Sequence, residues 1–460
     1  MAGNSPKGVR HRYPTTHPIG ARSIATRYPS ARLHNAKRKA IKPQKSSAKP
    51  DFAIDRRMPL IDTFLVAIVV GAMLFNLQIG SLTPLLIIGA IGAFVVLRWE
   101  RLYPLFADCW PLILLPAFVC LSAAWSSVPS TTLYYAMVYT LTVLGGLIIG
   151  GGVRARSFVV GMFIALAFYS IMSIAFGRMV NWGEGAGDAF AGLAGSKNQF
   201  GDFSGLAMIA TIAAGSIFMT ERRWVPAVFC AGLFPLLLVN LYLAKATSAL
   251  VSSVVASGCL VLFIASRKLE IQARSGILIA TLIVVAAAIA TMDFWLPPLF
   301  DMFLDASGKN RGLTGRVDLW RYGRAIMADS PVLGIGYNAF WLHGNMDAEH
   351  LWKMMGISTR MGFNFHNTFM EIRVHTGWVG MAVFAAVWIY AAVRLFLRAL
   401  LNPAIPLVMA SALIIFFSMK LQFEVIGFET MHFSTIIGFA ALAMGLRSTG
   451  KAKAPLPQRR

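Results

Sequence analysis

Long apolar runs recur along most of the chain, separated by short polar segments that often contain arginine or lysine. A run of about 20 apolar residues has the length at which an α-helix crosses the hydrocarbon core of a bilayer. The runs predict twelve transmembrane helices, at 59–77, 81–97, 104–124, 131–150, 157–177, 200–219, 224–243, 247–265, 275–292, 377–396, 403–420 and 431–446. Because a helix satisfies its backbone hydrogen bonds internally, we expect an all-α, polytopic membrane protein with about 12 transmembrane helices.

The spacing of the runs divides the chain into five parts. We expect a disordered basic tail at 1–58, transmembrane helices 1–9 at 59–292, a long loop at 293–376, transmembrane helices 10–12 at 377–446 and a basic tail at 447–460. The long loop alternates polar and aromatic segments, which predict short amphipathic helices.

The composition agrees with this pattern and excludes a soluble globular enzyme. Of 460 residues, 57% are hydrophobic and 13% are charged, and the mean hydropathy is +0.64; soluble domains carry about 25% charged residues. The net charge of +22 is concentrated in residues 1–58, where fourteen Lys/Arg face only Asp51 and Asp55. This tail is either a polybasic arm on anionic lipid headgroups or only a determinant of orientation, and no nucleic-acid motif accompanies it.

The positions of lysine and arginine predict the orientation of the chain. If the first tail is cytoplasmic, thirty of the 42 Lys/Arg fall in cytoplasmic segments, and each of these segments holds at least two. Cytoplasmic loops of membrane proteins carry such an excess. We therefore expect both termini in the cytoplasm and 293–376 outside it. The outer cations are then Arg178, Lys197, Lys245, Lys420 and eight residues of the long loop.

Residues 314–329 of this loop, TGRVDLWRYGRAIMAD, predict an amphipathic helix with Thr314 as its N-cap. Arg316 and Arg324 share a broad face of that helix, with Trp320 between them. Arginine grips phosphate oxygens through two parallel donors, so this face is a candidate diphosphate site. The alternative is ordinary contact with lipid headgroups.

Arg321 is instead expected to point toward Asp318, three residues before it, in a structural role. Three further polar residues lie on outer segments in this topology: Lys197 and Asn198 before the sixth span, and Lys245 in the turn after the seventh. The two lysines are candidates for binding a phosphate-bearing lipid; the alternative is that they only extend toward the membrane surface.

His366 stands before a second predicted helix, which starts in the segment HNTFMEI and continues into the span after Gly377. Histidine suits proton abstraction near neutral pH, and the neighbouring Asn367 and Glu371 are candidates to support it. The alternative is a polar residue at a loop–helix junction.

We expect no metal and no cofactor. His343 and His350 are in the same loop, but neither HExxH nor another close ligand spacing occurs, and no nucleotide-binding motif is present. The four cysteines lie in or beside apolar runs, as packing residues do.

Several segments of the chain together resemble the O-antigen ligase and polymerase superfamily of bacterial envelope glycosyltransferases. Within that superfamily, the likeness is greatest to the rhizobial type of exopolysaccharide repeat-unit polymerase. The resemblance spans roughly residues 58 to 446. The segments that carry it are LSAAWSSVPSTTL (121–133), GLAGSKNQFG (192–201), LAKATSAL (243–250), LTGRVDLWRYG and PVLGIGYNAFW (within 313–341), HNTFMEI (366–372) and TGWVG (376–380).

The resemblance implies a GT-C-like membrane fold and an inverting, metal-independent transfer of a glycan from undecaprenyl diphosphate on the periplasmic face of the inner membrane. Arg316 would bind the donor diphosphate and His366 would be the acid–base residue. Two positions depart from the pattern of the ligases: Thr247 stands where an arginine is frequent, two residues after Lys245, and Thr376 where a glutamate is frequent.

We therefore expect polymerisation of exopolysaccharide or O-antigen repeat units, with a flippase and a chain-length regulator as possible partners. A ligase that joins the glycan to lipid A core is the alternative. Two rivals come from other classes: a polysaccharide transporter, although the two halves of the chain contain no inverted repeat, and a non-catalytic envelope scaffold, which gives the arginine and histidine no reason to meet.

Overall fold

The computed structural model describes residues 60–181, 188–291, 294, 316–360 and 362–448. The first basic tail, most of the second and the proposed N-cap Thr314 lie outside these ranges. The α-helices are α1 (Leu60–Leu74), α2 (Asn76–Ile79), α3 (Leu82–Leu97), α4 (Leu102–Leu121), α5 (Pro129–Leu147), α6 (Ala155–Phe176), α7 (Lys197–Thr220), α8 (Trp224–Ala244), α9 (Thr247–Ala265), α10 (Ile271–Ala290), α12 (Arg316–Asp329), α13 (Met346–Met354), α14 (Thr368–Leu401), α15 (Ile405–Lys420) and α16 (Phe433–Leu446). Short turns of 3₁₀ or π type are η1 (Trp99–Arg101), η2 (Ser122–Ala124), η3 (Ile148–Gly152) and η4 (Ser266–Lys268).

Each of the twelve apolar runs coincides with one α-helix. Seven of the described helices are long and apolar enough to cross a membrane, and α1, α3, α15 and α16 are shorter apolar helices. The prediction of an all-α, polytopic membrane protein is confirmed. The sequence did not predict the antiparallel ribbon of β1 (Arg178–Asn181) and β2 (Asp188–Gly192) between α6 and α7.

Helix α7 is the most enclosed of the long helices, and it packs against α6, α8, α9 and α15. A second group forms around α16, which packs against α5, α14 and α15. Small residues allow close approach of such helices: a Cβ at Gly150, in η3, would collide with the backbone of Ala440 in α16. Both groups belong to one continuous hydrophobic core.

Helix α14 is interrupted at Gly377, whose φ of 62° lies in the left-handed region. The interruption separates an outer part, residues 368–376, from the long apolar part. The segment after α12 docks at this point: the N–H of Trp378 donates to Pro331 O at 2.9 Å, and that of Val379 to Val332 O at 3.1 Å. A Cβ at Gly377 would collide with the Val332 carbonyl, so this docking requires glycine.

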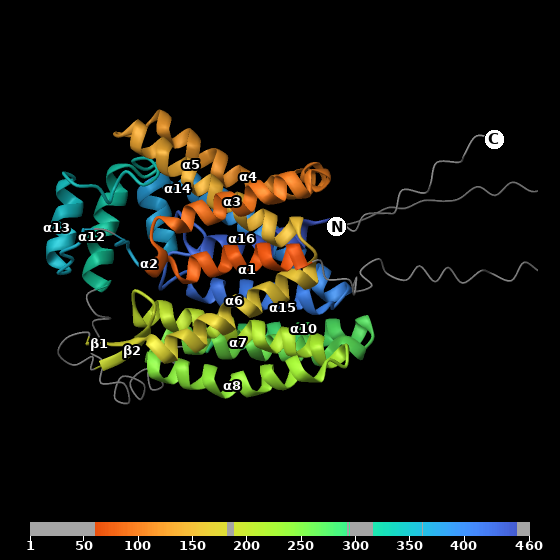
Figure 1. The fold of residues 1–460 in the computed structure, drawn as a ribbon. Helices are drawn as coiled ribbons and strands as arrows, with labels where there is room; N and C mark the ends of the chain where they lie inside the picture. Colours follow the sequence, from red (N-terminus) through yellow and green to blue (C-terminus); the bar gives the residue numbers. More distant parts are fainter. Residues whose placement is uncertain (1–59, 182–187, 292–293, 295–315, 361, 449–460) are drawn as a thin grey trace, which may run out of the picture. The chain divides into compact units, whose positions relative to one another are not determined.

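Helices α12 and α13 lie together at one end of the helical bundle (Figure 1). They have a separate hydrophobic core, which we call the outer core. Its buried members are Leu319, Met327, Phe340, Ala348, Leu351, Trp352, Phe365, Met370 and Val374. The outer part of α14 contributes to it, so the outer core is attached to the membrane helices through α14.

Several cations of the predicted cytoplasmic segments hold helices together. The buried Asp62 pairs with Arg98 at 3.3 Å and Arg101 at 3.4 Å. Arg156 forms two hydrogen bonds with Glu221, at 2.8 and 2.6 Å. These arginines therefore have structural partners besides any role in orientation.

Candidate active site

Glu424, in the loop between α15 and α16, is the centre of the candidate site. Its Oε1 accepts a hydrogen bond from Asn198 Nδ2 at 3.3 Å and lies 3.5 Å from Arg316 Nη2. Its Oε2 lies 3.3 Å from His366 Nδ1. Asn198, Arg316 and His366, which come from three separate stretches of sequence, thus meet at Glu424. The sequence analysis had not selected this glutamate.

Arg316 is the first described residue of α12 and its side chain is largely buried. Nη1 donates to the carbonyl of Phe423 at 2.9 Å, while Nη2 faces Glu424. The guanidinium is therefore held from two directions by the loop between α15 and α16. A guanidinium has five N–H donors in a planar fork, so donors remain for a further ligand.

His366 has a φ of 49°, an unusual conformation for a residue with a side chain. Its N–H donates to Asn364 Oδ1 at 2.8 Å, which holds the backbone in this conformation. The carboxylate of Glu424 faces Nδ1 and favours a proton on that nitrogen. The other ring nitrogen, Nε2, is then the basic one, and within the described ranges no hydrogen bond occupies it.

The charge of Glu424 is well defined. Burial would raise its pKa, but the hydrogen bond from His366 and the positive charges of Lys420, His366 and Arg316 lower it to about 2. The carboxylate is therefore ionised at neutral pH. It balances the cations around it and orients the imidazole of His366.

Lys420, counted above among the outer cations, is not free to meet a ligand at the surface. It is fully buried at the end of α15, and its Nζ donates to the buried Asp202 of α7. A buried ammonium needs such a partner because desolvation is costly. The ion pair ties the start of α7, which carries Asn198, to the helix that leads into Glu424.

The backbone of Phe365, next to His366, is held on both sides. Its carbonyl accepts from Trp320 Nε1 at 2.8 Å, and its N–H donates to Glu371 Oε2 at 2.9 Å. Glu371 is buried, and its Oε1 also contacts Trp341 Nε1 at 3.1 Å and His375 Nε2 at 3.0 Å. Trp320 and Glu371 are thus placed to support the position of His366 without contacting its ring.

Asn367 and Thr368 fix the start of α14 to the same loop. Asn367 caps the helix by accepting from Met370 N at 3.1 Å, and its Nδ2 donates to Gln422 O at 3.3 Å. The hydroxyl of Thr368 donates to Glu424 O at 2.7 Å. The backbones that carry His366 and Glu424 are therefore joined directly.

The remaining predicted residues lie outside this cluster. Arg324 is exposed, and no ion pair to it occurs among the described residues. Arg321 pairs with Asp318 at 3.3 Å, as expected. Lys197 begins α7 beside Asn198 and is half-buried, and Lys245 is exposed in the turn between α8 and α9 with a φ of 48°.

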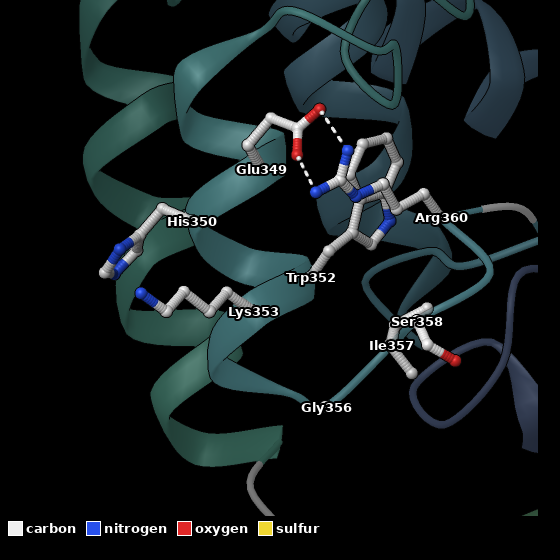
Figure 2. Close-up of a pocket in the computed structure, with 8 residues that line it drawn as sticks. All are labelled: Glu349, His350, Trp352, Lys353, Gly356, Ile357, Ser358 and Arg360. Atoms are coloured by element: carbon white, nitrogen blue, oxygen red, sulfur yellow. Dashed lines mark hydrogen bonds and ion pairs between the residues drawn. The ribbon is translucent and has the colours of Figure 1, made fainter.

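A surface cavity of about 550 Å³ lies on α13 and the segment after it (Figure 2). Glu349 and Arg360 form an ion pair at 3.2 Å beside it, and His350 and Lys353 line its edge. The cavity shares no residue with the cluster around Glu424. Across the described ranges, no three His, Cys, Asp or Glu side chains are grouped as a metal site requires, and His343 and His350 are part of no such group.

Two comparisons bear on this arrangement. A family model described as O-antigen ligase matches residues 232–385, a range that includes α12, α13 and His366. The exopolysaccharide production protein ExoQ of Rhizobium meliloti (strain 1021) is 30% identical over 334 residues, which cover 71% of this chain and 74% of that protein. The chain belongs to the O-antigen ligase/polymerase superfamily. The resemblance read from the sequence is confirmed. The protein is therefore a multi-pass membrane protein that transfers glycans in the manner of a polymerase or a ligase. The family implies a lipid-linked glycan donor and a glycan acceptor.

In this member of the superfamily, sequence reasoning overlooked the segment LQFEVIGFETMH, residues 421–432. Residues 421–430 join the last two predicted spans, and His432 falls at the start of the predicted span 431–446. The signal of this segment was the density of titratable groups, because Glu424, Glu429 and His432 occur within nine residues. Such a density is unusual in a connection that only joins two apolar helices.

Proposed function

We propose that this protein polymerises repeat units of an exopolysaccharide or O-antigen by transferring a glycan from undecaprenyl diphosphate to a sugar hydroxyl. The observation that carries the proposal is the meeting of His366, Glu424 and Arg316. This meeting supports a site in which His366 is the base, Glu424 orients it and Arg316 is the cation for an anionic leaving group.

The reaction is a single inverting displacement. The acceptor hydroxyl gives its proton to His366 Nε2, and its oxygen bonds to the anomeric carbon of the donor glycan. The bond between that carbon and the diphosphate oxygen breaks, and the diphosphate leaves with the electron pair. His366 becomes an imidazolium whose charge is balanced by Glu424.

Arg316 binds the diphosphate and stabilises the charge that develops on it, so that the chemistry proceeds without a metal ion or a nucleotide. Lys197, Lys245 and Arg324 are further candidates to attract the anionic donor. Asn198 orients Glu424, while Trp320, Asn367 and Glu371 support the backbone around His366.

The site lies on the periplasmic face of the inner membrane, with both termini in the cytoplasm. The distribution of lysine and arginine supports this orientation. The segment 293–376 is then the long periplasmic loop, between nine transmembrane helices before it and three after it. A flippase that delivers the donor and a regulator of chain length are the expected partners.

The choice of a polymerase over a ligase rests on the relative named for exopolysaccharide production. Transfer to lipid A core is the second candidate, favoured by the description of the matching family model as O-antigen ligase. The two differ in the acceptor, so the product distinguishes them: repeat units joined to each other, or a glycan on lipid A core.

The test uses purified protein in lipid nanodiscs with a lipid-diphosphate-linked repeat unit of the host's own polysaccharide. We expect a ladder of polymers from the wild type, and a loss of about 10²–10⁴-fold in rate for His366→Ala, the range that general bases contribute. The exposed Arg321→Lys variant is the matched control. Full activity of His366→Ala, with wild-type folding, would remove the base from the mechanism.

A further inference from the structure

A second carboxyl–imidazole pair lies in the loop between α15 and α16. Glu429 Oε2 is 3.4 Å from His432 Nδ1, and the two side chains are 28% and 27% exposed. Both are therefore accessible to a ligand, like His366 at 29%. Neither residue has a role in the mechanism above.

Asn364 connects this pair to His366. Because Asn364 Oδ1 accepts from the N–H of His366, its other atom, Nδ2, must be the one that donates to Glu429 Oε1, at 2.6 Å. One amide thus holds the catalytic histidine on one side and Glu429 on the other. The two pairs are parts of one hydrogen-bonded unit.

The contacts around the pair favour a proton on Glu429. His432 is the N-cap of α16, and its Nδ1 accepts from the N–H of Ser434 at 3.4 Å, so Nδ1 presents a lone pair. The hydroxyl of Ser434 lies 2.7 Å from Nδ1 and 3.4 Å from Val425 O, and the shorter distance favours donation to Nδ1. Oε1 of Glu429 already acts as an acceptor, so the contact between Oε2 and Nδ1 is favourable when Glu429 carries the proton. His432 is then neutral, with its hydrogen on Nε2.

The surroundings favour the same proton arrangement. Burial and the nearby carboxylates of Glu371, from α14, and Glu424 raise the pKa of Glu429 to about 8, against the hydrogen bond from Asn364. Burial and the charge of Lys420, from α15, lower the pKa of His432 to about 4, although Glu424 opposes the shift. From the segment after α12, the hydroxyl of Tyr337 donates to Phe428 O at 2.8 Å.

We propose that His432, held by the protonated Glu429, uses its Nε2–H to bind an oxygen of the lipid-diphosphate donor. This inference rests on the proposed function and assigns the donor a second anchoring side chain. The physical reason for a neutral pair is the charge of the ligand: an ionised Glu429 would repel a diphosphate, whereas a neutral carboxyl and a neutral imidazole accept it. Within the described ranges, no hydrogen bond occupies His432 Nε2.

The pair predicts a pH dependence of donor affinity. As the pH rises above about 8, Glu429 ionises, and we expect the KM for the donor to rise by about tenfold per pH unit, with a smaller change in kcat. Glu429→Gln keeps the shape and donates an amide N–H to Nδ1 at every pH. Its KM should remain flat from about pH 6.5 to 9.5, whereas that of the wild type rises above about pH 8.

The second part of the experiment removes the hydrogen-bond donor, the imidazole of His432. His432→Ala should raise the donor KM by about 10- to 100-fold at all pH values, as expected for a lost hydrogen bond to a charged group, with kcat affected less. Glu349→Gln, at the separate cavity on α13, is the matched control and should leave KM and its pH dependence unchanged. Thermal unfolding of each variant excludes a loss of fold.

The inference is overturned if Glu429→Gln retains the alkaline rise in KM, or if folded His432→Ala keeps the wild-type KM. Failure of the proposed function is distinguishable, because the wild type would then consume no donor at any pH. Because KM cannot then be measured, the affinity of the nanodisc-embedded protein for a synthetic polyprenyl diphosphate is measured instead. Binding that His432→Ala leaves unchanged would refute the inference on its own.

Discussion

Glu424→Gln is the substitution that examines the centre of the site most directly. The amide has nearly the size of the carboxylate, but it carries no charge and only one of its two terminal atoms accepts hydrogen bonds. If its NH₂ faces His366, it donates to Nδ1 and moves the histidine's own proton to Nε2. Nε2, the nitrogen proposed as the base, is then protonated and cannot accept the proton of the acceptor hydroxyl.

The structure sets the expected magnitudes. The difference between the ordinary pKa of 4.5 and the value of about 2 for Glu424 corresponds to about 3 kcal/mol of stabilisation of the folded state. Because this pKa is lowered on folding, the contribution is complete above about pH 4.5 and is lost as the pH falls toward 2. Activity should fall by about 10²–10⁴-fold, the contribution of a general base.

The assays are polymer formation per amount of folded protein, and thermal unfolding in detergent at pH 7 and at pH 4. We expect Glu424→Gln to be less stable than the wild type at pH 7, with a smaller difference at pH 4. The double variant with His366→Ala should be no slower than His366→Ala alone, because the two residues act as a unit. A kcat within a factor of ten of the wild type, or fully additive losses in the double variant, would refute the reasoning.

Three further predictions follow from described contacts. Arg316→Lys keeps the charge but replaces the planar fork of two nitrogens by a single nitrogen, so transfer should fall by about 10- to 100-fold, while the exposed Arg321→Lys stays within about twofold. Gly377→Ala should lower the yield of folded protein and its unfolding temperature, since the backbone conformation alone costs about 1–3 kcal/mol; an unchanged unfolding temperature would contradict it. In a cysteine-free background, a maleimide that does not cross membranes should label Ser358→Cys but not Ser448→Cys in spheroplasts, and the reverse pattern would invert the topology.

The membrane helices were predictable from the sequence because burial in lipid acts locally. A run of apolar residues determines a helix whatever its neighbours are, and every predicted span corresponds to a helix. The helix over 316–329 was predictable for a similar reason, as its polar and apolar faces alternate with helical periodicity. Short amphipathic helices were expected in the long loop, but the bounds of α13 were not predictable, and no local pattern indicated the β1–β2 ribbon, because both elements are short and depend on packing.

The candidate site was only half predictable. Arg316, Asn198 and His366 were selected by residue type and by their position outside the membrane, but their shared partner Glu424 lies 226, 108 and 58 residues from Asn198, Arg316 and His366. Residues so far apart in sequence become neighbours only through the packing of α7, α14 and α15. The burial of Lys420 was not predictable for the same reason, since its partner Asp202 becomes adjacent only in the fold.

The outer core around Trp352 is separate from the core of the membrane helices. Structural units with their own core can open without the rest of the protein, so damage there need not disturb the apolar helices on which insertion depends. Substitutions in the outer core, such as Leu351→Ala, should therefore leave the amount of protein in the membrane nearly normal while abolishing its activity. A mutational screen that scores abundance would count them as harmless, and only one that scores the polysaccharide would find them.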